Sequence, residues 1–435
     1  MPTITEPARL TPVVAEVDVL VVGGGSAGVS AAVAAAREGA RVVLVERYGS
    51  LGGLATGGLI VLLLTLDDGQ GRQVIGGLCQ EVTERLVHAG AAVHPPRADW
   101  GRDDPELVRR WAEWGLIWGG ASAHHRVRYS VAYDPEALRA LLNDVVTDAG
   151  VELRLHTWGA DALMDGDRVR GVAFQSKAGR EAVLARVVVD ATGDGDVFAS
   201  AGCAFALERV HPWLWFRLGG VRDVDAVLAQ ADRGPGWFRT PNPGVLLLPW
   251  GSVAKIERTI DPTDPRDLTY AEVACRRLVM AEVERLRRDV PELADAHVCN
   301  IATQLGITES RRLVGRRVLA RDDVGKPAAD AIAVTGHWTK YDAVYAIPYG
   351  CLVPRETRNL LAAGRIISVD HRVHHATKEI PACMAVGEAA GTAAAMAAAA
   401  DGDVGRVDVA ALRRRLVARG ALLDYFDASP VGSPS

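Results

Sequence analysis

The feature that most constrains the fold is a glycine-rich segment near the N-terminus, Asp18-Val-Leu-Val-Val-Gly23-Gly24-Gly25-Ser26-Ala27-Gly28. A short apolar, β-branched run precedes the glycines, and an alanine-rich stretch with helical spacing follows over 27–38. A second apolar strand is expected over 41–46. A strand, a tight glycine turn, a helix and a second strand in this order predict the first βαβ unit of a Rossmann-like α/β fold with a parallel sheet.

The spacing of the glycines predicts a dinucleotide site at this turn. Gly23 and Gly25 allow the backbone to turn sharply and to approach a pyrophosphate, and Gly28 lets the helix pack closely on the strand. The helix N-terminus adds backbone N–H groups that favour phosphate. Glu46 ends the second strand 18 residues after Gly28, where an acid accepts a hydrogen bond from a ribose 2′-hydroxyl and disfavours a 2′-phosphate.

Two later segments indicate which dinucleotide is bound. Residues 186–190, Arg-Val-Val-Val-Asp, are expected to form a buried strand that leads into Ala191-Thr192-Gly193, and residues 359–363 are expected to form a second one that leads into Gly364-Arg365. In a doubly wound sheet the carboxyl ends of parallel strands lie on the ligand side. The N-terminal fingerprint alone fits NAD as well as FAD, whereas the two additional strand ends favour FAD.

With these motifs the chain resembles the FAD-dependent oxidoreductases among the two-dinucleotide-binding-fold flavoproteins, in the group related to fumarate reductase and glutathione reductase. Besides the fingerprint, the resemblance is carried by colinear blocks over 51–57, 133–138, 189–197, 309–315, 347–354, 359–368 and 381–395. It implies an FAD-dependent enzyme in which a Rossmann-like FAD-binding domain is interrupted by a mixed α+β substrate domain. None of the histidines matches a covalent attachment motif, so a noncovalent FAD is expected.

The order of the segments predicts one discontinuous nucleotide-binding core and one inserted part. We expect a flexible tail over 1–15, an FAD-binding domain over 16–90, 134–204 and 345–425, and a substrate or cap domain over 91–133 and 205–344. Further predicted elements are a hairpin that turns at 177–179, helices over 268–289 and 309–321, and an alanine-rich helix over 382–399. Trp213, Trp215 and Trp237 are candidates for the wall of a substrate pocket.

The resemblance also assigns cofactor contacts to individual residues. It places the pyrophosphate at the first glycine turn, the adenosine ribose near Glu46, and the flavin pyrimidine at the N-terminus of helix 382–399, whose dipole favours negative charge there. The expected FAD-binding residues are Gly23, Gly25, Ser26, Ala27, Gly28, Glu46, Arg47, Gly52, Gly53, Thr56, Trp158, Ala160, Ala191, Thr192, Gly193, Gly364, Arg365, Ala382 and Met384.

The candidate catalytic residues lie just before the last helix. The family pattern has an arginine three residues before the helix-opening proline, and Lys378 occupies that position here. Lysine lacks the planar fork with which arginine clamps a carboxylate. His371 and His375 stand nearby, and histidine is a suitable base for the proton that accompanies hydride loss. His371 is favoured because it follows the strand first, with His375 and Lys378 as alternatives. A solvated charged loop is the competing interpretation.

The predicted reaction is hydride transfer between a small organic substrate and flavin N5, with oxygen, NAD(P)H or a redox partner as second reactant. A monooxygenase that works through a flavin hydroperoxide is the alternative, although no second GxGxxG motif for NAD(P)H occurs. The six cysteines form no CxxC pair, which argues against a thiol–disulfide flavoenzyme. No Cys/His group has zinc-site spacing either, so no metal is expected.

Composition narrows the range of partners. The 49 basic and 54 acidic side chains give a formal net charge of -5, which argues against nucleic-acid binding. The N-terminus has no basic region leading into an apolar one, as a secretory signal requires. Of the two apolar stretches, 13–36 contains acidic residues and glycines and 382–400 is mostly alanine, so neither indicates a membrane span. We therefore expect a cytoplasmic enzyme with no membrane or nucleic-acid partner.

Overall fold

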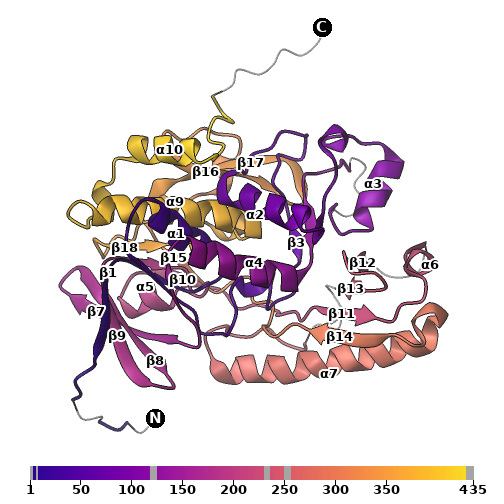
Figure 1. Cartoon of the computed structure of the whole chain (residues 1–435), viewed down its shortest axis with the longest axis horizontal. Coiled ribbons are helices and arrows are strands. Elements are labelled where there is room, and N and C mark those ends of the chain that lie inside the picture. The colour runs from indigo at the N-terminus through magenta and orange to yellow at the C-terminus, as the bar shows by residue number, and fades with distance from the viewer. Residues whose placement is uncertain (1–2, 6–7, 118–124, 230–235, 249–255, 428–435) are drawn as a thin grey trace.

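The computed structural model describes residues 3–5, 8–117, 125–229, 236–248 and 256–427. Within them, a seven-stranded sheet has the strand order β6-β2-β1-β9-β8-β7, with β18 also paired to β9, and its strands β1, β7, β8 and β9 lie on the left in Figure 1. The strands are β1 (Val13–Val22), β2 (Val42–Val45), β6 (Glu152–Arg154), β7 (Trp158–Asp165), β8 (Arg168–Ser176), β9 (Gly179–Asp190) and β18 (Leu360–Ala362). This sheet confirms the predicted Rossmann-like α/β fold.

The part of the sheet that bears the predicted nucleotide site is parallel. β1 pairs in parallel with β2 and β9, β2 with β6, and β9 with β18. Residues 19–22 of β1 are buried, as expected for strands covered on both faces. The register sets Val22 and Ala362 on either side of Asp190, so three strands end together. β7, β8 and β9 form antiparallel pairs, and the turn predicted at 177–179 is confirmed.

Two helices lie against this sheet and against each other. α1 (Ser26–Arg37) and α9 (Ile380–Ala398) lie side by side over the parallel strands (Figure 1). A Cβ on Gly387 would lie 2.2 Å from the carbonyl oxygen of Ala27, and a Cβ on Gly391 would lie 2.0 Å from that of Ala31. The helix backbones therefore touch at these glycines. By length and composition α9 could cross a membrane, yet 89% of its apolar 18-residue stretch is buried inside the protein.

The inserted segments build a second layer of structure beside the main sheet. An antiparallel sheet in the order β12-β13-β11-β14 runs alongside the long helix α7 (Pro265–Asp289) (Figure 1). Its strands are β11 (Phe216–Gly219), β12 (Phe238–Arg239), β13 (Leu246–Leu248) and β14 (His297–Ile301). α7 begins three residues before the predicted helix because Asp264 caps it and Pro265 occupies its first turn.

The helix predicted over 309–321 is wrong. Residues Arg311–Leu313 form strand β15, which pairs antiparallel with β10 (Phe205–Leu207), and a 3-10 turn follows at Arg321–Asp323. The reason is tertiary pairing: Arg312 forms an ion pair with Glu208 just after β10, and Arg311 forms one with Asp196. Contacts with distant residues therefore override local helix propensity here.

Two predicted boundaries differ in the structure. β1 begins at Val13, inside the expected tail, because Val13 pairs with Ala182 of β9. The small sheet β3-β5-β4 crosses the boundary placed at 90/91, and the division into two domains stays a prediction.

The remaining elements are β3 (Leu62–Leu63), α2 (Gly77–His88), β4 (Ala92–Val93), α3 (Pro105–Ala112), β5 (Val131–Tyr133), α4 (Pro135–Asp148), α5 (Asp196–Ser200), α6 (Val224–Ala229), β16 (Ala331–His337), β17 (Lys340–Pro348), α8 (His371–Thr377) and α10 (Val409–Ala418).

Candidate active site

A cavity of about 470 Å³ is lined by the segments that directly follow β1, β9 and β18. Parallel strands present their carboxyl ends at one edge of a sheet, which is where ligands bind in this type of fold. The structure brings most of the predicted site residues to this cavity: Gly23, Gly25, Ser26, Ala27, Glu46, Arg47, Gly52, Gly53, Trp158, Ala191, Thr192, Gly193, Gly364, Arg365, His375 and Lys378.

The other predicted site residues lie around the cavity rather than in its lining. Gly28 serves packing, since a Cβ there would lie 1.7 Å from the carbonyl oxygen of Gly23. The Thr56 hydroxyl donates to the carbonyl oxygen of Leu51 at 2.6 Å. Ala160 lines a small neighbouring cavity that also includes Trp158. The remaining three are Ala382 and Met384, which are buried in α9, and His371, which is exposed on α8.

The glycine turn leaves room for a phosphate group. Gly23 has φ +105°, and a Cβ there would lie 2.4 Å from the carbonyl oxygen of Ala191, so only glycine fits. At Gly25, by contrast, a Cβ would meet only the Cα of Gly53, at 4.0 Å. Gly25 caps α1 without any side-chain hydrogen bond. The space in front of the α1 N-terminus is therefore open, and it fits the pyrophosphate of a dinucleotide.

Glu46 fixes the same turn from the end of β2. Its Oε2 accepts a hydrogen bond from the backbone N–H of Gly24 at 2.6 Å, and its Oε1 accepts one from that of Tyr48 at 2.8 Å. Burial raises the pKa of Glu46 above its usual value, although these hydrogen bonds oppose the shift. The carboxylate thus braces the turn and still lines the cavity, where it fits a ribose hydroxyl.

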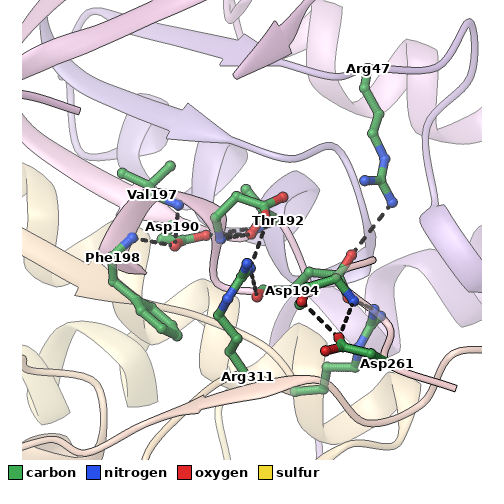
Figure 2. Close-up of polar contacts among 11 residues, drawn as sticks. Arg47, Asp190, Thr192, Asp194, Val197, Phe198, Asp261 and Arg311 are labelled. Atoms are coloured by element: carbon green, nitrogen blue, oxygen red, sulfur yellow. Dashed lines mark hydrogen bonds and ion pairs between the residues drawn. The ribbon is translucent and has the colours of Figure 1, made fainter. Parts of the chain in front are cut away.

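Asp190, which the sequence analysis did not single out, anchors the turn after β9. Its carboxylate accepts hydrogen bonds from the N–H groups of Thr192 (3.0 Å), Val197 (3.0 Å) and Phe198 (2.9 Å), as Figure 2 shows. Burial raises its pKa to about 6. An acid directly after the buried apolar run 187–189 is a signal in the sequence that could have identified Asp190, because a buried carboxylate needs several donors.

Three arginines converge on Asp194 in this turn. Arg47 Nη2 lies 3.6 Å from its carboxylate, and Arg311 donates to its backbone carbonyl at 2.9 Å (Figure 2). Arg365 Nη2 lies 3.0 Å from the same carboxylate. The guanidinium of Arg47 also lies over the ring of Trp158, 5.1 Å from its centroid. The Nε of Arg365 is buried and has no partner among the described residues. The three guanidinium groups and the unpaired Arg365 Nε can therefore bind an anionic group of a cofactor.

The other end of the cavity has an apolar wall. Trp213 and Trp215 line it from the segment before β11, as predicted, whereas Trp237 is not among the lining residues. Trp338, Leu305 and Ile307 complete this wall. The segment around 304 is bound to the glycine-rich segment 52–58, since Gln304 N donates to the carbonyl oxygen of Gly57 at 3.1 Å. An apolar wall next to the nucleotide turn is typical of a substrate pocket.

The segment before α9 is the helix α8 and not a solvated loop. His371, His374, His375 and Lys378 are spaced i, i+3, i+4 and i+7, so they share one helical face. That face surrounds the buried carboxylate of Glu309. The distances from Glu309 oxygens are 3.0 Å to His371 Nδ1, 3.6 Å to His374 Nδ1, 3.9 Å to His375 Nε2 and 3.5 Å to Lys378 Nζ.

The electrostatics of this cluster follow from burial and from its close charges. Burial and the charge of Lys378 lower the pKa of His375 to about 4, so its imidazole is neutral at pH 7. Burial opposes the ionisation of Glu309, but His374 and Lys378 outweigh it and lower the pKa to about 2. Glu379, the N-cap residue of α9, also lines the cavity, and burial raises its pKa to about 7. Glu309 was not among the residues predicted for the site, although it lies at the centre of this cluster.

A Rossmann-like sheet whose three strand ends meet at one dinucleotide-binding cavity defines the class of FAD-binding proteins. The chain belongs to the FAD dependent oxidoreductase family, whose model matches residues 18–416. The protein is therefore an FAD-dependent oxidoreductase, and FAD is its cofactor. The predicted family, enzyme class and cofactor are confirmed.

Curated relatives match only part of the chain. It is 29% identical over 177 residues to NADH:fumarate oxidoreductase from Klebsiella pneumoniae (strain 342), a match that covers 36% of this chain and 18% of that protein. It is 28% identical over 193 residues to fumarate reductase (cytochrome) from Shewanella frigidimarina, which covers 41% of this chain and 33% of the relative. The matched region thus spans a third or less of these relatives' length.

Among solved structures, the chain is similar to p-nitrophenol 4-monooxygenase PnpA from Pseudomonas putida DLL-E4, with a TM-score of 0.47 and 14% identity over 96% of this chain and 91% of that one. It is also similar to glycine oxidase from Geobacillus kaustophilus, with a TM-score of 0.46 and 16% identity over 86% of this chain and 93% of the other.

Proposed function

We propose that this enzyme transfers a hydride between a small organic substrate and N5 of FAD. The observation that carries the proposal is that His375 and Lys378 line the same cavity as the glycine turn and the tryptophan wall. When bound, the flavin supplies the hydride acceptor or donor. The chain must then bind the substrate beside it and handle one proton.

The residues of the cavity divide this work. Trp213, Trp215 and Ile307 bind the carbon skeleton and exclude water, which strengthens polar interactions inside the site. The neutral imidazole of His375 accepts the proton of an alcohol or amine as the hydride leaves, since its pKa is lowered to about 4 by burial and Lys378. Lys378 donates to the Thr308 hydroxyl at 3.2 Å, which together with Glu309 fixes its ammonium group at the cavity wall.

An anaerobic reduction experiment tests the proposal. The yellow protein is mixed without oxygen or NAD(P)H with a panel of alcohols, amines and hydroxy acids, and the flavin absorbance is followed. We expect one substrate class to bleach the flavin in a saturable manner. Fumarate belongs in the panel as an acceptor for the pre-reduced enzyme, because the chain is similar to part of an NADH:fumarate oxidoreductase and of a fumarate reductase.

The same experiment separates the alternative chemistry. A monooxygenase working through a flavin hydroperoxide is reduced by NAD(P)H or a partner reductase and incorporates an atom of oxygen into its product. If no organic substrate bleaches the flavin but NAD(P)H does, and ¹⁸O from oxygen gas appears in the product, hydride transfer from the organic substrate is the wrong assignment.

A further inference from the structure

We propose that Glu309 and the α8 face formed by His371, His374, His375 and Lys378 carry protons between the cavity and solvent. This inference rests on the proposed function in one respect, namely that a reaction in the cavity releases or consumes a proton. It assigns roles to residues that the hydride transfer itself does not explain. His371 becomes a proton carrier at the surface and not the base that meets the substrate.

The cavity end of the route is His375. Its side chain is partly exposed and lines the cavity. Its Nε2 lies 3.9 Å from Glu309 Oε1, so the ring lies near both the cavity and the buried carboxylate without a hydrogen bond between them. Lys378 lies beside it with Nζ 3.5 Å from the same oxygen. A proton taken from the substrate by His375 therefore has an acceptor on the far side of the ring.

The centre of the route is the carboxylate of Glu309, whose side chain is 8% exposed. Its two oxygens face different groups: Oε1 faces His374, His375 and Lys378, and Oε2 faces His371. A carboxylate that takes a proton at Oε1 must rotate its carboxyl group to present that O–H to His371, and the proton is then released on the far side without movement of the backbone.

His374 gives this centre a second proton-binding position. Its side chain is fully buried, and its Nε2 lies 2.7 Å from the carbonyl oxygen of Arg365, which can only accept. Nε2 therefore carries a hydrogen. Any further proton on the ring sits on Nδ1, 3.6 Å from Glu309 Oε1, where the charge of the carboxylate attracts it although the two atoms are not hydrogen-bonded. Burial lowers the pKa of His374, so this proton is given up readily.

The solvent end is His371, whose side chain is 57% exposed and whose Nδ1 lies 3.0 Å from Glu309 Oε2. Glu208 lies 3.9 Å from the same nitrogen and is paired with Arg312. His371 thus connects a buried carboxylate directly to water. Other charged or titratable groups near the route are His337, whose pKa burial lowers to about 3, and the Arg365 side chain, which pairs with Asp194.

The proton balance closes along this path. Oxidation of an alcohol or amine breaks a C–H bond, whose electron pair leaves with the hydride, and an O–H or N–H bond, whose proton goes to His375. Side-chain motion closes the 3.9 Å gap between His375 Nε2 and Glu309 Oε1, and the proton passes to that oxygen. The carboxyl group then rotates, the same proton passes to His371 Nδ1, and the exposed ring releases a proton to water. In reduction every step runs in reverse. No additional oxidant or reductant takes part.

The test follows proton uptake without any organic substrate. FAD-loaded protein in weakly buffered solution is reduced by a light flash with 5-deazaflavin, and a pH-indicator dye records the proton that the reduced flavin draws in. In His371→Ala we expect flavin reduction at the wild-type rate and proton uptake slowed by roughly 10-fold or more. Added imidazole, which can enter the space left by the ring, should restore the fast uptake.

Two further variants make the test specific. His88→Ala removes another exposed histidine, at the end of α2 and outside the route, and should leave proton uptake unchanged. Glu309→Gln keeps the shape of the central side chain but cannot pass a proton, so uptake should be slow and imidazole should not restore it. Both effects require the cluster to conduct protons and not merely to hold α8 in place.

The outcomes separate this inference from the proposed function. Wild-type proton uptake in His371→Ala, or slow uptake that imidazole leaves unchanged, overturns the relay. Since the flash needs no organic substrate, either result leaves hydride transfer standing. Conversely, a normal relay in a protein whose flavin no organic substrate reduces overturns the proposed reaction and keeps the relay.

Discussion

Lys378 Nζ lies 3.5 Å from Glu309 Oε1, although the two residues are far apart in the sequence and belong to different parts of the fold. The lysine occupies the position at which the family pattern has an arginine. The side chain of Lys378 is 7% exposed and that of Glu309 is 8% exposed, so the pair is shielded from solvent and its attraction is stronger than that of a surface pair. Glu309, which lies between β14 and β15, therefore holds the ammonium group of a lysine that lines the cavity.

Two glycine substitutions in the same turn should have opposite consequences. Gly25→Val should leave the fold intact, because a Cβ there meets only the Cα of Gly53 at 4.0 Å, and should abolish FAD binding by filling the pyrophosphate space. Gly28→Ala should instead lower the thermal stability of the apo-protein, since its Cβ would lie 1.7 Å from the carbonyl oxygen of Gly23. Thermal unfolding and the flavin-to-protein absorbance ratio measure both effects. A Gly25→Val protein that purifies with full flavin occupancy would place the pyrophosphate elsewhere.

The purified protein should carry about one noncovalent FAD per chain, and acid precipitation should release the colour into the supernatant. Glu46→Ala should weaken FAD binding by roughly 1–3 kcal/mol, as expected for the loss of a charge-assisted hydrogen bond. The loss includes an indirect part, because Glu46 also holds Gly24 N and Tyr48 N. Titration of the apo-protein with FAD gives the dissociation constants. A yellow pellet after acid treatment would contradict the noncovalent cofactor.

The nucleotide half of the site could be predicted from the sequence because its signals are local. The glycines around Gly25, the acid at 46 and the glycine turns after two apolar strands each carry their meaning within a few residues. Parallel pairing then brings these strand ends together, as the register of Asp190 with Val22 and Ala362 shows. Knowledge of the fold class was therefore enough to assemble this half.

The catalytic half could not be assembled in the same way. Glu309 contributes the central carboxylate, but it opens the segment 309–321, which was predicted as a helix and contains the strand β15. The spacing of His371, His374, His375 and Lys378 was visible in the sequence, yet nothing local indicated which residue they surround. Contacts of this kind are set by tertiary packing. The same packing places His375 in the cavity lining and leaves His371 exposed outside it, which is why the proposed base is His375.

Glu309 should make the stability of the protein depend on pH in the acid range. Its pKa in the folded state is lowered to about 2, from about 4.5 for an ordinary glutamate. The ionised form therefore stabilises the fold fully above about pH 4.5, and this contribution is lost as the pH falls toward 2. This shift corresponds to a contribution of Glu309 to the free energy of unfolding on the order of 3 kcal/mol. Urea unfolding of the wild type and Glu309→Gln between pH 3 and 7 tests this.

In that comparison the wild type should lose more stability than the variant as the pH falls, so the difference between them should shrink toward acid. A matched control is Glu282→Gln on the exposed face of α7, whose carboxylate pairs with Arg285 at the surface. Exposed pairs contribute little, so this variant should follow the wild type at every pH. Parallel curves for the wild type and Glu309→Gln would show that the carboxylate is not ionised preferentially in the folded state.

The proton acceptor is tested last, by His375→Ala and His371→Ala assayed with the substrate that bleaches the flavin. His375→Ala should retain FAD and slow flavin reduction by about 10²–10⁴-fold, the usual contribution of a general base. Its imidazole must be neutral to accept a proton, so the wild-type rate should fall as the pH drops through about 4, where His375 becomes protonated.

His371 lies outside the cavity lining, and in concentrated buffer the flavin of His371→Ala should be reduced at close to the wild-type rate. Stopped-flow absorbance at several pH values separates the two variants. Equal slowing of both in concentrated buffer would assign the base role to His371, and an unaffected His375→Ala would move it to Lys378 or Glu379.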